Sequence, residues 1–473
     1  YDVDGSCSVA MLAKYLKFRK AKFNYFIPDR FKDGYGPNID LLKIFKKENY
    51  KLIIFMDCGT NAINEIDYLN SQNIKSIIID HHKIYDLSLK PSVFINPLKS
   101  KEYNKYDLFC SSNLVFFLLR FILFKNKETK KFELSSFLIY AALGTICDVM
   151  PLKGINRKVC IEAINKFNIF RNNVFSNILK SNKINRELNI DDLGYIIGPI
   201  LNSGGRLGKS NLATKLLISE DKKEIEEISN MLIQTNERRK LIEVELLNKI
   251  EKKLSIKNNY IFYNDSNLNE GILGIIAARL AEKYNVPTIL LTNSGNIFKG
   301  SARSVDKVDI GKILLNSFQK GIIIKGGGHS MAGGFSILKK NIIKFDEYLS
   351  NSIKIKNNIN KKTYISKHSL SILNDEFAKS LKKISPFGNM NKAPIFMFEN
   401  VKIIKTKIIN ERHVFFIVKS GHKSCTGMAF NSLKTEIGNV LRFYKKEISI
   451  LAETKENSLN SSKFQLVLKD IIF

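Results

Sequence analysis

The stretch that decides the fold is residues 52–82, which reads LIIFMDCGTNAINEIDYLNSQNIKSIIIDHH. It contains two short apolar runs, at 52–56 and 77–79, on either side of a mixed segment that is long enough for a helix. Short apolar runs with polar residues at both ends are typical of strands that are buried on both faces. A similar run at 23–27 and further helical stretches continue this alternation to about Pro151, which predicts an α/β domain with a parallel sheet.

Acidic residues and histidines follow both runs directly. Asp57 comes after the first run, and Asp80, His81 and His82 come after the second. Because ligands of open parallel sheets bind at the carboxyl ends of the strands, we expect these side chains to lie close together. Three further aspartates are candidates for the same cluster: Asp2 and Asp4 in YDVDG, and Asp148 in LGTICDVMPL.

Such a cluster of carboxylates would repel itself unless cations neutralise it. Hard oxygen ligands with imidazole and without thiolate favour Mn²⁺ or Mg²⁺ over structural zinc. The candidate ligands exceed the needs of one ion, so the sequence predicts two. A pair of ions about 3.5–4 Å apart suits phosphoester hydrolysis, because it binds both the attacking and the leaving oxygen. A lone aspartate after a strand is often a turn or a helix cap, and paired histidines can be a polar loop; their joint occurrence favours the metal site.

The composition sets wider limits. A chain of 473 residues predicts two to four domains. The formal charge of +30 favours a polyanionic partner such as nucleic acid, although the Lys-, Asn- and Ile-rich composition of an AT-rich genome would also produce it. The six cysteines form no CxxC pair, so we expect no disulfide framework and a reducing cytoplasm. The longest apolar stretch, 114–124, is interrupted by Arg120 and is too short for a membrane span.

The rest of the chain predicts a second lobe and a barrel. Amphipathic patterns at 225–232 and 244–254 predict a long helix between two lobes. Strands at 260–263 and 288–291, a helix around 274–281 and the glycine cluster 326–334 then indicate a second α/β lobe that closes near residue 350. Residues 351–362 are expected to be a polar linker. Alternating runs at 401–404, 414–418 and 464–468 predict a small β-barrel.

Four motifs resemble the successive motifs of the DHH phosphodiesterases: DVDG at 2–5, MDCGT at 56–60, DHH at 80–82 and LGTICDVMPL at 143–152. The stretch GGGHSMAGG at 326–334 is similar to the signature of the DHH-associated domain. Five longer segments look like those of the RecJ branch of this family: LNSGGRLG at 201–208, NERRKLIE at 236–243, EGILGIIAARL at 270–280, KGSARS at 299–304 and SPFGNMNKAPIF at 385–396. The resemblance therefore covers essentially the whole chain.

The resemblance implies two α/β lobes, a DHH domain over 1–215 and a DHH-associated domain over 258–350, joined by a helical connector over 216–257. A C-terminal oligonucleotide-binding (OB) barrel over 363–473 would follow. The implied activity is 5′ to 3′ hydrolysis of single-stranded DNA to 5′-mononucleotides in DNA repair and recombination, by a cytoplasmic monomer with two Mn²⁺ or Mg²⁺ ions. Single-strand-binding protein and a helicase are the implied protein partners. The alternatives are a phosphodiesterase for short oligonucleotides or cyclic dinucleotides, and a non-catalytic scaffold, against which the intact motifs argue.

The resemblance also assigns roles to individual residues. It implies that Asp57 bridges the two ions, in a set of metal ligands that comprises Asp2, Asp4, Asp57, His81 and Asp148. It implies that His82 faces the scissile phosphate, that Asp80 orients an imidazole, and that Arg206 binds the phosphate nearest the metals. The terminal 5′-phosphate would be held by Arg30, Ser301 and Arg303. Further nucleic-acid contacts are expected from Asn202, Gly327, Gly328 and His329, although the glycines could also form a tight turn at a helix start.

The chain departs from the family pattern in three places. Family members usually carry another Asp just before the position of Tyr1, so we expect residues upstream of Tyr1, with a further metal ligand, in the natural protein. Leu268 and Asn269 stand where Trp-His is typical, and Ile200 stands where Arg often follows the proline. These departures predict differences in substrate contacts.

Overall fold

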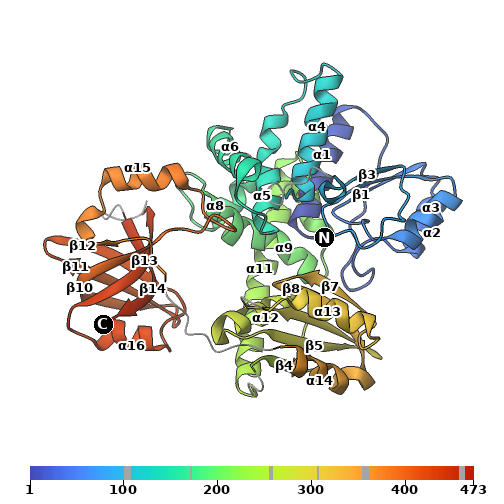
Figure 1. The fold of residues 1–473 in the computed structure, drawn as a ribbon. Helices are drawn as coiled ribbons and strands as arrows, with labels where there is room; N and C mark the ends of the chain where they lie inside the picture. Colours follow the sequence, from blue (N-terminus) through green and yellow to red (C-terminus); the bar gives the residue numbers. More distant parts are fainter. Residues whose placement is uncertain (101–107, 171–172, 255–258, 306–307, 354–362, 457–463) are drawn as a thin grey trace. The chain divides into compact units, whose positions relative to one another are not determined.

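The computed structural model describes residues 1–100, 108–170, 173–254, 259–305, 308–353, 363–456 and 464–473 (Figure 1). The chain divides into two compact units, one formed by Tyr1–Asp148 and Glu162–Asn358 and the other by Val149–Ile161 and Ile359–Phe473. None of the described helices is both long enough and apolar enough to cross a lipid bilayer.

The first lobe contains a parallel sheet in the order β1 (Leu52–Met56), β2 (Lys75–Ile79) and β3 (Val93–Ile95). Helix α3 (Ile63–Ser71) connects β1 to β2, and α2 (Ile39–Lys47) precedes β1 (Figure 1). The predicted strands at 52–56 and 77–79 are therefore confirmed. Their pairing runs from Leu52 opposite Lys75 to Met56 opposite Ile79, so both strands end at the same level of the sheet.

The predicted strand at 23–27 is wrong, because these residues form no regular secondary structure. Tyr25 and Phe26 are exposed, and the ring of Phe26 packs edge-on against Phe45 of α2, with 5.7 Å between ring centroids. A strand needs a neighbour to accept its backbone hydrogen bonds. Within the described residues, β1 pairs only with β2, so this run does not pair with the free edge of β1. Its apolar side chains contact a helix instead.

Helices complete the first lobe. The central helix is α1 (Val3–Phe18), which is buried along most of its length and packs against α4, α5 and α10. Most of its residues are apolar or small, which explains why it can be surrounded by other helices. The other helical segments are η1 (Pro97–Lys99), α4 (Ser111–Lys125), η2 (Leu134–Phe137), α5 (Leu138–Cys147), α7 (Asn173–Ser181), α8 (Ile190–Asp192), η3 (Leu193–Ile197), α9 (Gly198–Arg206) and α10 (Asn211–Ile218). Helix α6 (Gly154–Phe170) belongs to the second unit up to Ile161 and to the first unit from Glu162.

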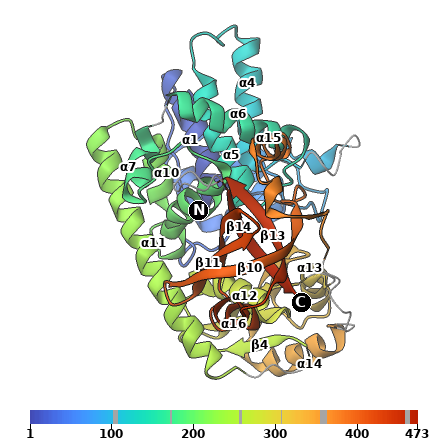
Figure 2. The same cartoon turned by 90° about the vertical axis from the view of Figure 1, so that its left-hand side faces the viewer.

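A single long helix, α11 (Lys222–Glu251), leads from the first lobe to the second (Figure 2). It begins at Asp221, whose side chain accepts a hydrogen bond from Glu224 N, an N-cap that satisfies one of the free backbone donors of the first turn. The two amphipathic patterns therefore belong to one helix, which confirms the predicted helical connection. The last predicted connector residues, 255–257, lie outside the described residues, as do 354–362 of the predicted polar linker.

The second lobe is built on a five-stranded sheet in the order β4-β5-β6-β8-β7. Its strands are β4 (Ile261–Asn264), β5 (Thr288–Ser294), β6 (Ile297–Arg303), β7 (Lys325–His329) and β8 (Ala332–Leu338). Its helical segments are α12 (Glu270–Tyr284), α13 (Ile310–Gln319), η4 (Lys339–Asn341) and α14 (Ile342–Ser352). The glycine cluster forms the β7–β8 hairpin, so a helix start is wrong for it. Gly328 has a φ of +152°, and an added Cβ would lie 2.2 Å from Ala332 O, which explains why glycine is required in this hairpin.

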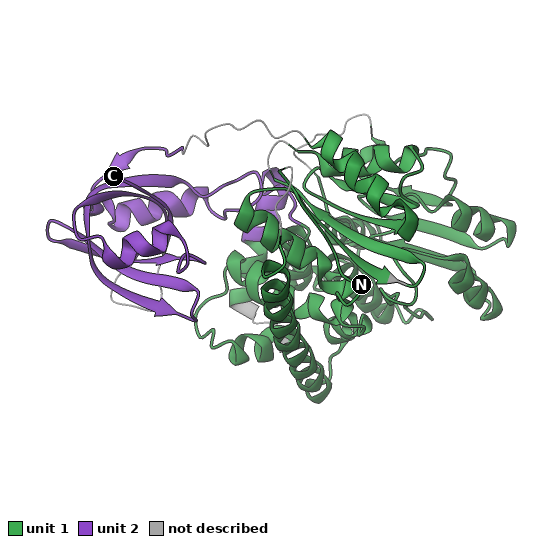
Figure 3. Cartoon of the chain, turned by 90° about the horizontal axis from the view of Figure 1, so that it is seen from below, with its two compact units in different colours: residues 1–148, 162–358 green, residues 149–161, 359–473 purple. Residues whose placement is uncertain are grey.

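The second compact unit contains the predicted barrel (Figure 3). Its strands follow the order β11-β12-β14-β13-β10, and an additional pairing between β10 and β11 closes the barrel. These strands are β10 (Ile395–Ile409), β11 (His413–Ser420), β12 (Lys423–Ala429), β13 (Ile448–Glu456) and β14 (Phe464–Ile472), and the short β9 (Lys367–His368) pairs with β10. The helical segments are η5 (Leu370–Ile372), α15 (Asp375–Ile384) and α16 (Glu436–Phe443). Residues 149–161 belong to this unit, where Leu152 N donates to Asn389 O at 2.8 Å.

Candidate metal centre and phosphate-binding arginines

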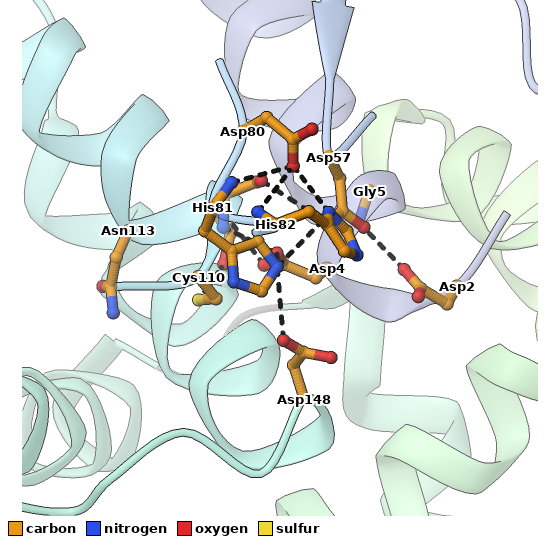
Figure 4. Close-up of polar contacts among 12 residues, drawn as sticks. Asp2, Asp4, Gly5, Asp57, Asp80, His81, His82, Cys110, Asn113 and Asp148 are labelled. Carbon is orange, nitrogen blue, oxygen red and sulfur yellow. Dashed lines mark hydrogen bonds and ion pairs between the residues drawn. The ribbon is translucent and has the colours of Figure 1, made fainter. Parts of the chain in front are cut away.

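Because β1 and β2 end at the same level of the sheet, the residues that follow them, Asp57 and Asp80, lie at one edge of it. Asp57 N donates to Ile79 O at 3.0 Å, which continues the pairing for one residue beyond β1. The φ of Asp57 is +60°, a left-handed conformation that aspartate tolerates better than most residues. The chain therefore turns sharply there, and the carboxylate of Asp57 is buried beside His81 (Figure 4).

His81 is the centre of the cluster. Its Nε2 lies 3.3 Å from Asp57 Oδ1, 3.3 Å from Asp148 Oδ2 and 4.0 Å from Asp4 Oδ2 (Figure 4). This nitrogen is buried and has no well-aligned hydrogen-bond partner in the described part of the chain. Burial alone would lower the pKa of His81, but the surrounding carboxylates raise it to about 10. A buried imidazole nitrogen ringed by carboxylate oxygens has the donor chemistry of a divalent metal site.

Asp4 is fixed by a helix that lies far from it in the sequence. Helix α4 has no side-chain cap of its own, and instead Ser111 N and Ser112 N donate to the two oxygens of Asp4 at 2.7 and 2.9 Å. A carboxylate at a helix N-terminus is stabilised by the unpaired N–H groups and the helix dipole. Gly144 of α5 makes room for this contact, because an added Cβ would lie 2.2 Å from Asp4 Oδ1.

Asp2 joins the cluster from the start of α1. It is the N-cap residue, and its Oδ1 accepts a hydrogen bond from Gly5 N at 3.1 Å. The Cβ position of Gly5 would lie 3.7 Å from Asp2 Oδ1 and 3.5 Å from Asp57 Oδ2, so both carboxylates border this glycine. The structure thus brings all five predicted metal ligands to one place.

The carboxylates of the cluster destabilise one another. Burial, together with the charges of Asp2 and Asp4, raises the pKa of Asp57 well above its usual value. Burial and the same two charges raise the pKa of Asp148 to about 7. Divalent cations would remove this cost. The donor set therefore fits Mn²⁺ or Mg²⁺, which prefer carboxylate oxygens with some imidazole.

Asp80 and His82 form a separate pair beside the cluster. Asp80 Oδ1 accepts hydrogen bonds from His81 N at 2.8 Å and from His82 Nδ1 at 2.6 Å, and Oδ2 accepts one from Thr60 N at 3.0 Å. Although Asp80 is buried, hydrogen bonds from His82 and Thr60 hold its pKa below the usual range. Atoms of Asp57, Asp80, His81 and His82 lie within 4.8 Å of one another, so distance alone would allow Asp80 to bind metal. Its hydrogen bonds instead favour the role of orienting His82.

Sequence reasoning missed Tyr35. Its hydroxyl lies 2.9 Å from His82 Nε2, and the pKa of Tyr35 is raised well above 10 by burial and by the charges of Asp57 and Asp2. Because Asp80 binds Nδ1, the neutral Tyr35 hydroxyl can donate to Nε2. Ser111, Ser112 and Gly144 were also missed. Of these, only the two serines carried a signal, since hydroxyl residues before an apolar run are typical of a helix start.

The three predicted phosphate-binding arginines lie near one another. Arg206 Nη1 donates to Gly271 O at 3.3 Å, and Arg303 Nη1 donates to Ser301 Oγ at 3.2 Å. The guanidinium of Arg30 lies 4.6 Å from the ring centroid of Tyr1. Burial and the charges of Arg30, Arg239 and Arg303 lower the pKa of Arg206 to about 10. Among the described residues, no carboxylate lies within ion-pair distance of Arg30, Arg206 or Arg303, so this positive charge is available to an anion.

The glycine hairpin of the second lobe faces the DHH motif. Burial and the charges of His82 and Lys83 lower the pKa of His329, and the Cβ position of Gly327 would lie 3.7 Å from the hydroxyl of Tyr85. Gly328 lies between Gly327 and His329 on β7. Asn202 is half-buried on α9, the helix that ends at Arg206.

The residues that depart from the family pattern have structural roles here. Leu268 and Ile200 are buried in the hydrophobic core. Asn269 is the N-cap of α12, and its side chain accepts a hydrogen bond from Gly271 N at 2.9 Å. Asn269 therefore stabilises the helix start whether or not it touches substrate.

Three family models match the chain: the N-terminal domain of the DHH family over residues 1–145, the DHHA1 domain over 257–354 and the RecJ OB domain over 366–470. The single-stranded-DNA-specific exonuclease RecJ of Bacillus subtilis is 27% identical over 99% of this chain, and the chain spans 60% of its length. RecJ of Haemophilus influenzae is 26% identical, and the match covers 91% of this chain and 80% of that relative.

Solved structures show the same fold. The match to the crystal structure of Thermus thermophilus RecJ in complex with Mn²⁺ covers 100% of this chain and 67% of that chain, with a TM-score of 0.83 and 21% identity. The match to a second structure, an exonuclease RecJ bound to manganese, covers 74% of this chain and 87% of that chain, with a TM-score of 0.63 and 24% identity.

Proposed function

Because this chain belongs to the DHH family and carries the DHHA1 and RecJ OB domains, we propose that it is a metal-dependent exonuclease of single-stranded DNA. It would hydrolyse the strand from its 5′ end and release 5′-mononucleotides, in DNA repair and recombination. One observation carries this proposal most directly: the buried cluster around His81 lies in the same compact unit as three arginines that have no carboxylate partner among the described residues.

The cluster would hold two Mn²⁺ or Mg²⁺ ions through Asp2, Asp4, Asp57, His81 and Asp148, with Asp57 between them. Bound ions of this kind neutralise phosphate charge and lower the pKa of a bridging water. Asp80 fixes the ring of His82 through Nδ1, and Tyr35 contacts its Nε2. In this proposal His82 would face the scissile phosphate. Arg206 would bind the phosphate nearest the metal ions. The hairpin with Gly327, Gly328 and His329 would let the backbone of the strand approach closely, and Asn202 would make a further contact with it.

Direction requires an asymmetric anchor, since a metal pair cleaves a phosphodiester without regard to strand polarity. Arg30 lies on the first lobe, and Ser301 and Arg303 lie on the second. Burial and, after it, the charge of Arg30 lower the pKa of Arg303, which supports a common pocket for one anion. Such a pocket would bind the dianionic 5′-phosphate and disfavour a 5′-hydroxyl.

The decisive experiment incubates the full-length protein with Mn²⁺ and single strands labelled at either end, matched duplexes and dinucleotides. We expect long single strands to be shortened from the 5′ end to mononucleotides, while duplexes resist. Digestion only of dinucleotides would indicate a phosphodiesterase of short substrates. Binding of single strands without hydrolysis would indicate a scaffold.

Replacing Arg303 with alanine should reduce the preference for 5′-phosphorylated over 5′-hydroxyl strands by about tenfold or more. The reason is that charge-assisted hydrogen bonds are worth roughly 1.5–3 kcal/mol each, and about 1.4 kcal/mol is tenfold. The measurement is kcat/KM for matched strands with either end, in the wild type and the variant. An unchanged ratio would remove Arg303 from the anchor.

Replacing Lys402, Lys405 and Lys407 of β10 with glutamine should weaken binding of single strands and lower its salt dependence. These side chains are exposed on the barrel, and each phosphate contact contributes about 0.7 to the slope of log K against log salt. The measurement is affinity by anisotropy at several salt concentrations. The matched control replaces Lys43, Lys46 and Lys47, which are exposed on α2 and change the charge equally. Equal slopes in both variants would contradict a DNA-binding role for β10.

A further inference from the structure

Helix α12 presents two glycines to two of the arginines. Gly271 and Gly274 lie three residues apart, so they occupy the same face of the helix. An added Cβ at Gly271 would lie 2.1 Å from Arg206 O, and one at Gly274 would lie 2.7 Å from Arg303 Nη2. The helix thus comes into direct contact with the backbone of Arg206 on one lobe and with the guanidinium of Arg303 on the other.

The guanidinium of Arg303 is held by hydrogen bonds to its own strand. Its Nη1 donates to Ser301 Oγ at 3.2 Å and to Ala302 O at 2.9 Å, both on its own strand β6. No carboxylate pairs with it in the described part of the chain. The Cβ position of Gly274 is also 3.2 Å from Ser301 Oγ, so this glycine borders two of the three predicted anchor residues.

We propose that Gly274 is a positioning residue that sets the selectivity for a terminal phosphate, because its missing side chain lets Arg303 and Ser301 lie against α12. This inference rests on the proposed function and adds to it the residue that shapes the anchor. The ligand class is a phosphomonoester dianion at the end of a nucleic-acid strand. Any side chain at position 274 would push the guanidinium away from Ser301, which separates the two donors that share one phosphate.

The two glycines differ in what a substitution would displace. At Gly271 the obstacle is the backbone of Arg206, so alanine there would shift one lobe against the other. At Gly274 the obstacle is the far end of a flexible side chain, which can move while the fold stays intact. Alanine also favours a helix interior over glycine, so Gly274→Ala should melt at the same temperature as the wild type or higher. Gly274→Ala is therefore the variant that displaces the Arg303 guanidinium without disturbing the fold.

The experiment compares wild type, Gly274→Ala, Arg303→Ala and the double variant. Two quantities are measured: affinity for 5′-phosphorylated and 5′-hydroxyl strands by anisotropy in EDTA, and kcat/KM for the same strands in Mn²⁺. We expect Gly274→Ala to lower the phosphate preference by about fivefold or more in both assays, with kcat for 5′-hydroxyl strands unchanged. Because Gly274 acts through Arg303, the double variant should match Arg303→Ala within about twofold.

The control is Ala278→Gly, an exposed position one turn further along α12. It lowers the helix propensity of α12, so its melting temperature should fall while the phosphate preference stays at the wild-type value. A wild-type preference in Gly274→Ala, alongside a lost preference in Arg303→Ala, would overturn the inference. So would a double variant that loses much more than Arg303→Ala. Equal binding of both strand ends by the wild type would reject the anchor and the inference together, whereas a binding preference without hydrolysis would reject the proposed nuclease alone.

Discussion

Asp57→Asn is expected to abolish hydrolysis while leaving the metal-free protein at least as stable as the wild type. The loss of activity should exceed about 100-fold, the upper effect of residues that only support metal ligands, because Asp57 is proposed to bind both ions. Asparagine is the appropriate replacement, since it keeps the side-chain shape and tolerates the left-handed backbone at φ +60°. Asp57→Ala should lose activity equally.

The expected gain in stability follows from the raised pKa of Asp57. Burial and the charges of Asp2 and Asp4 raise the pKa of this carboxyl in the folded state, so its ionised form costs stability at neutral pH without metal. Removing the charge should raise the melting temperature of the metal-free protein at pH 8. The difference should shrink as the pH falls toward the pKa of an unfolded aspartate, where both states bind the proton.

Metal titration provides the second readout for Asp57. Mn²⁺ should raise the melting temperature of the wild type, because ligands that bind only the folded state stabilise it, and should raise that of Asp57→Asn much less. Differential scanning fluorimetry with and without Mn²⁺, beside a hydrolysis assay, measures both effects. Activity near the wild-type level in Asp57→Asn would remove Asp57 from the metal site. A variant that is inactive because it is unfolded would contradict the expected stability.

Gly144→Ala should destabilise the fold and impair the metal site together. The added Cβ would lie 2.0 Å from Ser112 Oγ and 2.2 Å from Asp4 Oδ1, so α5 cannot keep its distance from the start of α4. Overpacking of this kind costs about 1–3 kcal/mol, more than the roughly 1 kcal/mol by which alanine favours a helix. Asp4 would also lose its place at the N–H groups of Ser111 and Ser112. We expect a lower melting temperature, a weaker response to Mn²⁺ and at least about tenfold less activity, the lower end of the effect of residues that support a metal site.

A double variant separates the two effects of Gly144→Ala. Adding Ser112→Ala removes the hydroxyl that the new Cβ meets, but leaves the clash with Asp4. The double variant should therefore regain part of the lost stability without regaining the response to Mn²⁺ or the activity. Recovery of both properties would show that Asp4 is not displaced, and a wild-type melting temperature in Gly144→Ala alone would contradict the close packing of α4 and α5.

The sequence by itself determined the core strands of the first sheet, the connecting helix, the barrel and the residue types of the cluster. The apolar runs at 52–56 and 77–79 became β1 and β2, and the residues directly after them, Asp57 and Asp80, met at one edge of the sheet. The helical pattern at 225–254 became α11, and the alternating runs of the last hundred residues became the barrel. These features are readable because burial imposes a local period, close to 3.6 residues for helices and 2 for strands.

Only the tertiary structure decided which distant groups complete the site. Nothing near residues 23–27 shows that they stay outside the sheet, and nothing near Asp4 shows that α4 will hold its carboxylate. The contacts of Tyr35 with His82 and of Gly274 with Arg303 join segments that the chain separates widely. Their geometry depends on how helices and sheets pack, where a single Cβ decides whether two groups can approach. That information lies in the sum of many packing contacts and therefore appears in no single motif.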